Sequence, residues 1–172
     1  MGKLVVSDTN IFIDLIHMGL RRDFFLLPFD ITTVDFVIRE LKKAGQKETV
    51  LEYEARRELK VIEFSEAEIE DIFNLKQSTK GNVSYQDCAV WLCAKKTNAA
   101  ILTGDKALTI RAKNDNIEVH GLLYVLDQIV LNKIIPAYLA ADKLEELAKE
   151  NKRLPEDIIK DLILKWRSST SK

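Results

Sequence analysis

The chain has 172 residues, a length that favours one compact domain over two. Hydrophobic residues make up 47% and charged residues 31%, a composition that can build a full core and excludes a disordered chain. Lysine and arginine total 26 against 27 acidic residues, so the chain lacks the overall basic excess of many polyanion binders, although a local basic rim is compatible with this balance.

Cysteine usage and hydropathy bear on the compartment of the protein. Cys88 and Cys93 have neither a metal-binding nor a disulfide-framework spacing, and the apolar helical pattern around them predicts reduced core residues. No segment approaches the roughly 20 apolar residues that span a bilayer. The opening "MGKLVVS" is too short for a signal peptide. We therefore expect a cytoplasmic protein with no membrane partner.

Short apolar runs alternate with helical patterns along the first two thirds of the chain. The β-branched run "KLVV" (3–6) predicts a buried strand, and helical spacing follows in "IFIDLIHM" (11–18). A second strand is expected at 27–32, after which Thr33 is expected to cap a helix over 34–43. A charged helical stretch then leads to a third strand at 59–64.

The rest of the chain continues the alternation and then becomes helical. Ser65 is expected to cap an amphipathic helix over 66–77, and "SYQDCAVWLCAKK" (84–96) predicts another helix. Strands are expected at 99–103 and 117–120, with a short helix between them. Beyond Gly121 we expect three helices, at about 122–132, 136–150 and 155–167.

This order of elements predicts the fold class. Strands that alternate with helices imply right-handed crossovers and a mostly parallel sheet covered on both faces. We expect a three-layer α/β/α domain over residues 1–132 and a helical carboxyl-terminal extension over 133–172 packed on it. Apolar positions of this extension, among them Ile158 and Trp166, are expected in the core, with a dimer or partner surface as the alternative.

Four carboxylates stand at element boundaries. Asp8 follows the first strand, Glu40 lies on the second helix, Asp87 lies in the first turn of the 84–96 helix, and Asp105 follows the strand at 99–103. Ligands of open parallel sheets bind outside the carboxyl ends of the strands. If the first and fourth strands are neighbours, Asp8 and Asp105 meet at that edge, and the two helices could bring Glu40 and Asp87 there.

Each acid also has a purely structural interpretation. Asp8 could cap the first helix, as could Thr9. Ser84 and Asp87 match a capping box, and Asp105 in "TGDK" could be a turn residue. Glu40 could be one of many exposed helix acids, and periodicity alone does not distinguish it from Asp35 on the same helix. The functional interpretation rests on the joint placement of the four acids.

Crowded carboxylates repel one another and raise their own pKa values unless a cation neutralises them. Oxygen-only ligation suits Mg²⁺ or Mn²⁺. Such an ion generates a nucleophilic hydroxide near neutral pH and stabilises charge on a phosphoryl oxygen. The acids therefore indicate metal-assisted phosphodiester hydrolysis.

Four sequence blocks carry a resemblance to a known family. "VVSDTNIFIDL", "ITTVDFVIREL", "SYQDCAVWLCAKKTNAAILTGDKALTIRA" and "HGLLYVLD" resemble the successive blocks of a PIN-domain protein, over about residues 3–130. Their order and spacing are similar to the VapC-like toxin ribonucleases of toxin–antitoxin pairs. The last 40 or so residues carry none of these motifs.

The resemblance implies a fold, a chemistry and a set of partners. PIN domains are α/β/α folds with a five-stranded parallel sheet and are typically Mg²⁺- or Mn²⁺-dependent ribonucleases. Implied for this chain are an RNA substrate, products with a 5′-phosphate and a 3′-hydroxyl, a homodimer, and, for a toxin, an antitoxin protein as partner. The family's four acids correspond to Asp8, Glu40, Asp87 and Asp105, a correspondence that separates Glu40 from Asp35. All four are present as Asp or Glu.

Further residues are candidates for supporting roles. By the same resemblance, Thr9, Asn10 and Thr103 are expected to hold the metal-binding acids. Candidates for contacts to a nucleic-acid backbone are Lys42, Lys43, Lys106, Arg111 and Lys113, each of which could instead be part of a solvated surface. Trp91, one turn after Asp87, could stack on a base, but a core role is favoured. His17 and His120 are assigned no chemistry.

Two other functions are compatible with parts of the pattern. An aspartate-nucleophile phosphatase would use Asp8, although Asn10 stands where such enzymes carry a second aspartate. A non-catalytic PIN-like module would bind RNA or a protein without hydrolysis, and Mn²⁺ affinity would distinguish it from the nuclease.

Overall fold

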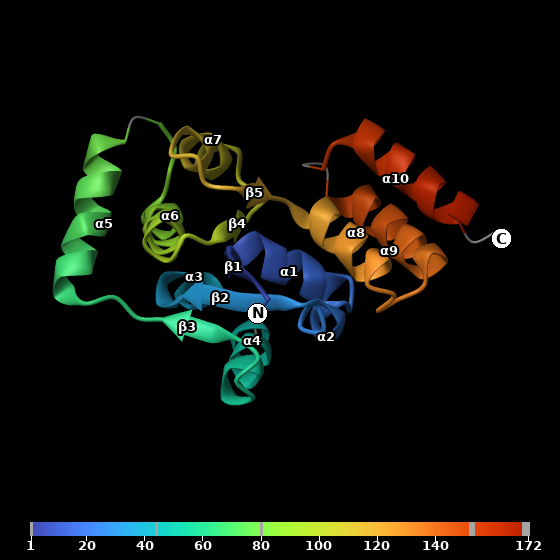
Figure 1. The fold of residues 1–172 in the computed structure, drawn as a ribbon, viewed down its shortest axis with the longest axis horizontal. Helices are drawn as coiled ribbons and strands as arrows, with labels where there is room; N and C mark the ends of the chain where they lie inside the picture. Colours follow the sequence, from blue (N-terminus) through green and yellow to red (C-terminus); the bar gives the residue numbers. More distant parts are fainter. Residues whose placement is uncertain (1, 44, 80, 152–153, 170–172) are drawn as a thin grey trace. The chain divides into compact units, whose positions relative to one another are not determined.

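The computed structural model describes residues 2–43, 45–79, 81–151 and 154–169. Within these ranges the chain forms five strands and ten helices (Figure 1). The strands are β1 (Lys3–Ser7), β2 (Phe29–Val34), β3 (Lys60–Ile62), β4 (Ala100–Leu102) and β5 (Val119–His120). The helices are α1 (Thr9–His17), α2 (Arg21–Phe24), α3 (Asp35–Glu40), α4 (Gln46–Ala55), α5 (Glu66–Ser78), α6 (Tyr85–Thr97), α7 (Lys106–Asn114), α8 (Leu122–Leu131), α9 (Ala137–Glu150) and α10 (Glu156–Ser169).

The strands form one parallel sheet in the order β3-β2-β1-β4-β5, which confirms the expected α/β fold with a five-stranded parallel sheet. β1 is the central strand, and Val5 and Val6 are completely buried, as expected for a strand covered on both faces. β1 pairs with β2 on one side and with β4 on the other, so the strand order reverses at β1. A ligand crevice in such a sheet is expected at the carboxyl edge near this point.

Helix α6 packs across β1, β2 and β4. Its inward residues, among them Cys88, Ala89, Val90 and Ala94, are completely buried. Cys88 and Cys93 are free thiols in this core, as predicted. The helix starts with a capping box, in which the Ser84 side chain accepts from the Asp87 backbone and the Asp87 side chain accepts from the Ser84 backbone.

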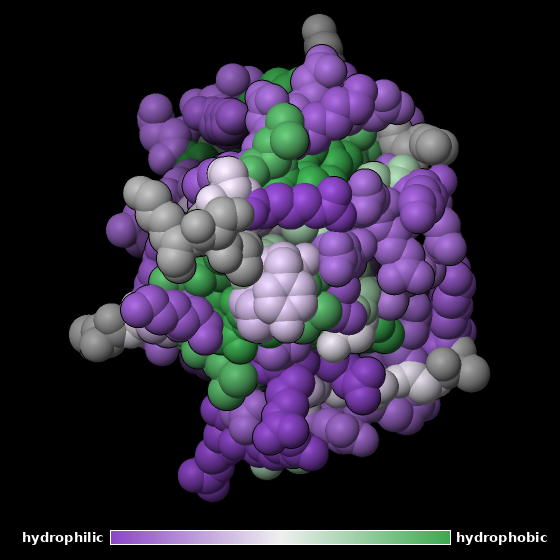
Figure 2. Space-filling model, turned by 90° about the vertical axis from the view of Figure 1, so that its right-hand side faces the viewer, coloured by the Kyte–Doolittle hydropathy of each residue, from purple (hydrophilic) through white to green (hydrophobic). Residues whose placement is uncertain are grey.

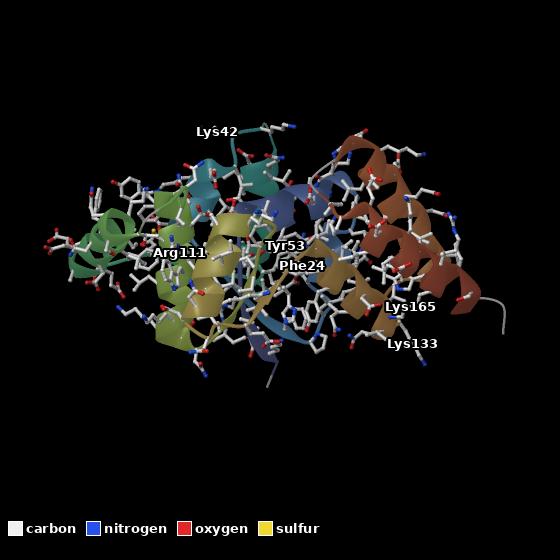
Figure 3. All side chains as sticks on the ribbon, turned by 90° about the horizontal axis from the view of Figure 1, so that it is seen from above. Phe24, Lys42, Tyr53, Arg111, Lys133 and Lys165 are labelled. Carbon is white, nitrogen blue, oxygen red and sulfur yellow. The ribbon has the colours of Figure 1, made fainter. Side chains whose placement is uncertain are left out.

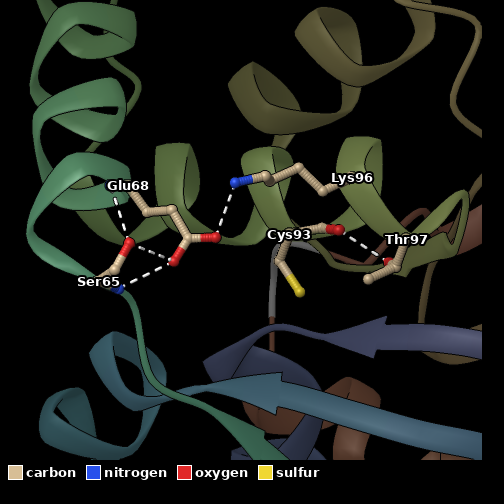
Figure 4. A network of polar contacts seen from close by, with 5 residues as sticks. All are labelled: Ser65, Glu68, Cys93, Lys96 and Thr97. Atoms are coloured by element: carbon tan, nitrogen blue, oxygen red, sulfur yellow. Dashed lines mark hydrogen bonds and ion pairs between the residues drawn. The ribbon is translucent and has the colours of Figure 1, made fainter.

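Helix α5 starts with a second capping box and is tied to α6 by its cap residues (Figure 4). Glu68 accepts hydrogen bonds from Ser65 N at 2.9 Å and from Lys96 Nζ at 2.7 Å. The Lys96 ammonium, followed by the hydrogen bonds from Ser65, lowers the pKa of Glu68 to about 2. The predicted cap at Ser65 is therefore confirmed, and its partner acid also links two helices.

The predicted boundaries of β2 and α3 were wrong. The strand continues to Val34, and α3 covers only Asp35–Glu40, so Lys42 and Lys43 follow the helix. Thr33 does not cap α3, because its Oγ1 donates to Ser7 O at 2.8 Å. The helix starts from an extended Val34 with no side-chain cap. Pairing with β3 at Thr33 and Val34 holds these residues in the strand.

The chain divides into two compact units. Residues 1–13 and 28–122 contain the sheet, and residues 14–27 and 123–172 form the second unit. In the second unit α9 and α10 pack side by side. Trp166 is 1% exposed and donates to Asp127 Oδ1 at 3.2 Å, while Arg167 pairs with Asp142 and Glu145. Trp166 thus takes the predicted core position.

Part of the surface of the second unit is apolar. Ile158 is 56% exposed, so its predicted core position was wrong. Figure 2 shows green apolar side chains between purple hydrophilic ones on one face of the protein. In the part of the chain that the structure describes, no helix has both the length and the apolar composition needed to cross a membrane.

Candidate active site

The carboxyl edge of the sheet positions four acids from four elements. Asp8 lies between β1 and α1, and Asp105 is the N-cap of α7 directly beyond β4. Because β1 and β4 are neighbours, these two acids leave the sheet at the same edge. Asp87 lies in the first turn of α6, Glu40 is the last residue of α3, and α3 contacts α6.

Asp8 is the most buried of the four acids, at 4% exposure, and hydrogen bonds hold both of its oxygens. Oδ1 accepts from Thr9 N at 2.7 Å. Oδ2 accepts from Asn10 Nδ2 at 2.8 Å and from Thr103 Oγ1 at 2.7 Å. These three donors fix the carboxylate, and they offset part of the free-energy cost of burying a charge.

Asn10 and Thr103 also join the two loops that leave β1 and β4. Asn10 Oδ1 accepts from Gly104 N at 2.8 Å, and Thr103 Oγ1 accepts from Asp105 N at 3.0 Å. A Cβ atom at Gly104 would lie 3.4 Å from Asn10 Oδ1, so the amide packs closely over this glycine. The same side chains therefore orient Asp8 and set the start of the Asp105 loop.

The other three acids are each held through one oxygen. Thr9 Oγ1 donates to Glu40 Oε2 at 2.6 Å, Ser84 N donates to Asp87 Oδ2 at 2.6 Å, and Leu108 N donates to Asp105 Oδ1 at 2.7 Å. A carboxylate has about four lone-pair positions, so each of these acids keeps acceptor capacity for a cation or for water. The capping and turn roles expected for Asp87 and Asp105 are thus real and do not exclude a site role.

Asp8 and Asp87 each experience the negative charges of other acids of the site. Burial raises the pKa of Asp8 to about 6, the hydrogen bonds from Thr103 and Thr9 oppose this rise, and the charges of Asp87 and Glu40 add to it. Burial also raises the pKa of Asp87, and the charges of Asp105 and Glu40 contribute in the same direction. Carboxylates coupled in this way favour protonation or the arrival of a cation.

The donor chemistry of these residues fits a hard divalent cation, because all four side chains offer only oxygen. Within the described ranges, however, the His, Cys, Asp and Glu side chains form no ready-made group of three or more that could hold a metal ion. The arrangement matches such a cation in charge and ligand type, and it would need water to complete the coordination.

The structure separates Glu40 from Asp35, which periodicity alone could not do. Glu40 bonds to Thr9, and its charge acts on Asp8 and Asp87. Asp35 pairs with Arg39 at 2.7 Å one turn along α3. The bond between Thr9 and Glu40 joins residues 31 positions apart and has no signal in the linear pattern.

The basic candidates lie on two different segments. Lys42 and Lys43 are exposed in the loop after α3, and Lys106, Arg111 and Lys113 lie on α7 (Figure 3 labels Lys42 and Arg111). Trp91 is buried and donates to Asp115 Oδ2 at 3.1 Å, which confirms its expected core role. His17 pairs with Glu150, and His120 lies against Glu118.

Solved structures of similar fold include proteins from archaea and bacteria. A PilT N-terminus domain protein from the hyperthermophilic archaeon Sulfolobus solfataricus P2 is 13% identical, covering 74% of this chain and 93% of that chain with a TM-score of 0.47. VapBC2 from Rickettsia felis, solved with a DNA fragment from its promoter, is 20% identical. The match covers 69% of this chain and 98% of that chain, with a TM-score of 0.41. FitAcB from Neisseria gonorrhoeae is 14% identical, covering 67% of this chain and 95% of that chain, with a TM-score of 0.42.

No curated protein matches the chain. A family model described as a PIN domain matches residues 4–168, nearly the whole chain and a range that includes the positions of the four acids. The protein belongs to the PIN-domain family.

Proposed function

We propose that this PIN-domain protein is a divalent-metal-dependent endoribonuclease whose acids are Asp8, Glu40, Asp87 and Asp105. The observation that carries the proposal is the burial of Asp8 at the carboxyl edge of the sheet, where the charges of Asp87 and Glu40 act on it and that of Asp105 acts on Asp87. A buried acid beside other carboxylates costs stability, and acids of this kind cluster at functional sites. Membership in a family of nucleases supplies the reaction class.

Asp8, Glu40, Asp87 and Asp105 would hold Mg²⁺ or Mn²⁺, directly or through water. When bound, the ion supplies a Lewis acid for the phosphate and lowers the pKa of a water molecule. Water is expected to complete the coordination, in keeping with the tendency of Mg²⁺ to retain several of its waters.

The chain's own residues orient the acids and the substrate. Asn10, Thr9 and Thr103 keep Asp8 in one orientation, and Thr9 also holds Glu40. Lys42, Lys43, Lys106, Arg111 and Lys113 are candidates to neutralise backbone phosphates, contacts that position a strand without reading its sequence.

The aspartate-nucleophile alternative fits the site less well. Both oxygens of Asp8 accept short hydrogen bonds, and the side chain is buried. The phosphatase pattern also has a second aspartate two positions after the nucleophile, where this chain carries Asn10, whose amide donates to Asp8.

The test is cleavage of single-stranded and structured RNAs with Mg²⁺ or Mn²⁺. Asp8→Asn should abolish cleavage, and Glu40→Gln should reduce it, while Asp35→Asn on the same helix is the matched control and should retain it. Equal cleavage by the wild type and Asp8→Asn would sink the assignment. A wild type that neither cleaves RNA nor binds Mn²⁺ at millimolar concentration would instead indicate a non-catalytic binding module.

A toxin role, an antitoxin partner and a homodimer belong to the same proposal and rest on the sequence resemblance. Expression of the wild type should arrest growth of a bacterial host, and Asp8→Asn should not. Sedimentation of the purified chain measures its oligomeric state. A host that grows equally well with both proteins would contradict the toxin role and leave the nuclease assignment to the cleavage assay.

A further inference from the structure

A buried hydroxyl reaches the backbone directly before Asp8. Thr33 is the last residue but one of β2 and is completely buried. Its Oγ1 donates to Ser7 O at 2.8 Å. The backbone register of β1 with β2 runs as far as Val6↔Thr32, so the Thr33 hydroxyl adds a contact between the two strands one position further along. That contact falls on the peptide that joins Ser7 to Asp8, the most buried acid of the site.

The peptide between Ser7 and Asp8 is held from both sides. Ser7 O accepts from Thr33 on β2, and Asp8 N of the same peptide donates to Leu102 O on β4 at 2.9 Å. β1 lies between these two strands (Figure 1), so the two bonds act in opposite directions across the sheet. A peptide group is planar. Because bonds on both edges fix this plane, they set the direction in which the chain leaves β1 and carries the Asp8 side chain.

This anchor differs from the bonds to the Asp8 carboxylate. The three donors to that carboxylate hold its oxygens, whereas Thr33 holds the backbone from which the side chain projects. The next residue is Thr9, which donates to both Asp8 and Glu40, so a tilt of the peptide would displace two acids of the site. Thr33 also lies two positions before α3, the helix that ends at Glu40. One hydroxyl therefore ties together the segments that carry Asp8 and Glu40.

We propose that Thr33 is a positioning residue, whose hydroxyl sets the orientation of the Asp8 carboxylate toward a divalent cation. The inference rests on the proposed function and adds a residue to it that acts through the Ser7 carbonyl. A serine at position 33 would keep the donor, whereas a valine would keep the shape of threonine and lose the donor. Loss of a group that orients metal ligands typically weakens metal affinity by about 10–100-fold.

The affinity of the purified chain for Mn²⁺, measured by calorimetry without RNA, tests this role. Thr33→Val should weaken Mn²⁺ binding by about tenfold, and Thr33→Ser should bind Mn²⁺ as the wild type does. Thr32→Val is the matched control, because Thr32 is a buried threonine on the same strand whose side chain lies on the other face of the sheet. This control should also bind Mn²⁺ as the wild type does.

A second measurement follows Asp8 in the absence of any metal. Thr9 N donates to Asp8 Oδ1 at 2.7 Å, so hydrogen exchange of the Thr9 amide reports on the orientation of that carboxylate. Thr33→Val should speed the exchange of this amide by about fivefold, as expected when one hydrogen bond is weakened, while Thr32→Val should not. Urea unfolding of the same proteins shows that each variant is folded under the conditions of both measurements.

Unchanged Mn²⁺ affinity and unchanged Thr9 exchange in Thr33→Val would overturn the role of Thr33. An equal loss of affinity in Thr32→Val would also overturn it, because the effect would then belong to the packing of β2 rather than to the hydroxyl. Should Thr33→Val not fold, Thr33→Cys takes its place with the same two expectations, since a thiol is only a weak donor.

The same measurements separate this inference from the proposed function. If the wild type binds Mn²⁺ and either of the overturning results occurs, Thr33 loses this role and the metal site stands. If the wild type neither binds Mn²⁺ nor cleaves RNA, the proposed function fails and the part of the inference that concerns the cation fails with it. Exchange of the Thr9 amide then still decides whether Thr33 orients Asp8.

Discussion

Asp8 shows how one residue can oppose stability and serve function. Its pKa in the folded chain is about 6, whereas the ordinary value is 3.8. The folded state therefore binds a proton more tightly than the unfolded state does. Stability from this group is present below the ordinary value and is lost as the pH rises through about 6. At neutral pH the folded protein holds Asp8 charged at a cost.

The first prediction follows from the raised pKa of Asp8 in the folded state. Lowering the pH from about 7 to about 5 should raise the free energy of unfolding contributed by Asp8 by about 1 kcal/mol. Asp8→Asn removes the titrating group and should lose that gain. Denaturant unfolding of both proteins at the two pH values measures the difference. An identical pH response in wild type and variant would contradict the buried-charge account.

Asn10 is an uncharged side chain and one of the three hydrogen-bond donors to the Asp8 carboxylate. Asn10→Asp replaces that donor by a carboxylate at the same 2.8 Å contact while it keeps the acceptor for Gly104 N. We expect a loss of about 1–3 kcal/mol in stability at neutral pH, because two carboxylates then face each other. Added Mn²⁺ or a lower pH should recover part of it. Thermal unfolding with and without Mn²⁺ measures the loss and its recovery. Asn10→Ala is the control, because it removes the hydrogen bond to Asp8 without adding a second carboxylate.

At the scale of elements, α5 and α6 start in the same way but differ in what their caps hold. Each begins with a serine and an acid three residues later. The acid of α5 pairs with Lys96, whereas the acid of α6 lies among the site carboxylates. The two helices thus offer a matched comparison between a structural cap and a cap in the candidate site.

Ser65→Ala and Ser84→Ala should each cost about 1 kcal/mol of stability, because each removes the side-chain acceptor of a capping box. Only Ser84→Ala should also reduce metal-dependent RNA cleavage, since it loosens Asp87. Urea unfolding and cleavage rates measured on the same preparations provide the comparison. If Ser65→Ala reduces cleavage to the same extent, the effect is one of stability alone.

The existence of β1, β2, α5 and α6 could be predicted from sequence, because β-branched runs and capping residues act locally. The end of β2 could not, since Thr33 and Val34 stay extended through pairing with β3 and through the Thr33 bond to Ser7 O. The acids could be predicted from the PIN resemblance. Thr9, Asn10 and Thr103 could also be named as residues that support the acids. The groups to which they bond could not be predicted, because the Thr9 bond to Glu40 and the Asn10 bond to Gly104 depend on the folded loops.

At the scale of the whole molecule, the carboxyl-terminal helices form part of a second compact unit with its own core. Trp166 lies in that core. Trp166→Ala should cost about 3–5 kcal/mol, while Ile158→Ala on the exposed side of the same helix should change stability by less than about 0.5 kcal/mol. Denaturant curves followed by circular dichroism measure both. A small effect of Trp166→Ala would show that α10 adds little to the stability of this unit.

The strand order has a consequence for the protein while it is being synthesised. β1 is synthesised before its partner β4, and Thr103 and Asp105 follow Asp8 by about a hundred positions. A growing chain that does not yet extend to β4 therefore presents Asp8 without its hydroxyl donor from Thr103 and without the fourth acid. The chain thus has every acid that cleavage of RNA would require only after β4 and the start of α7 have been synthesised.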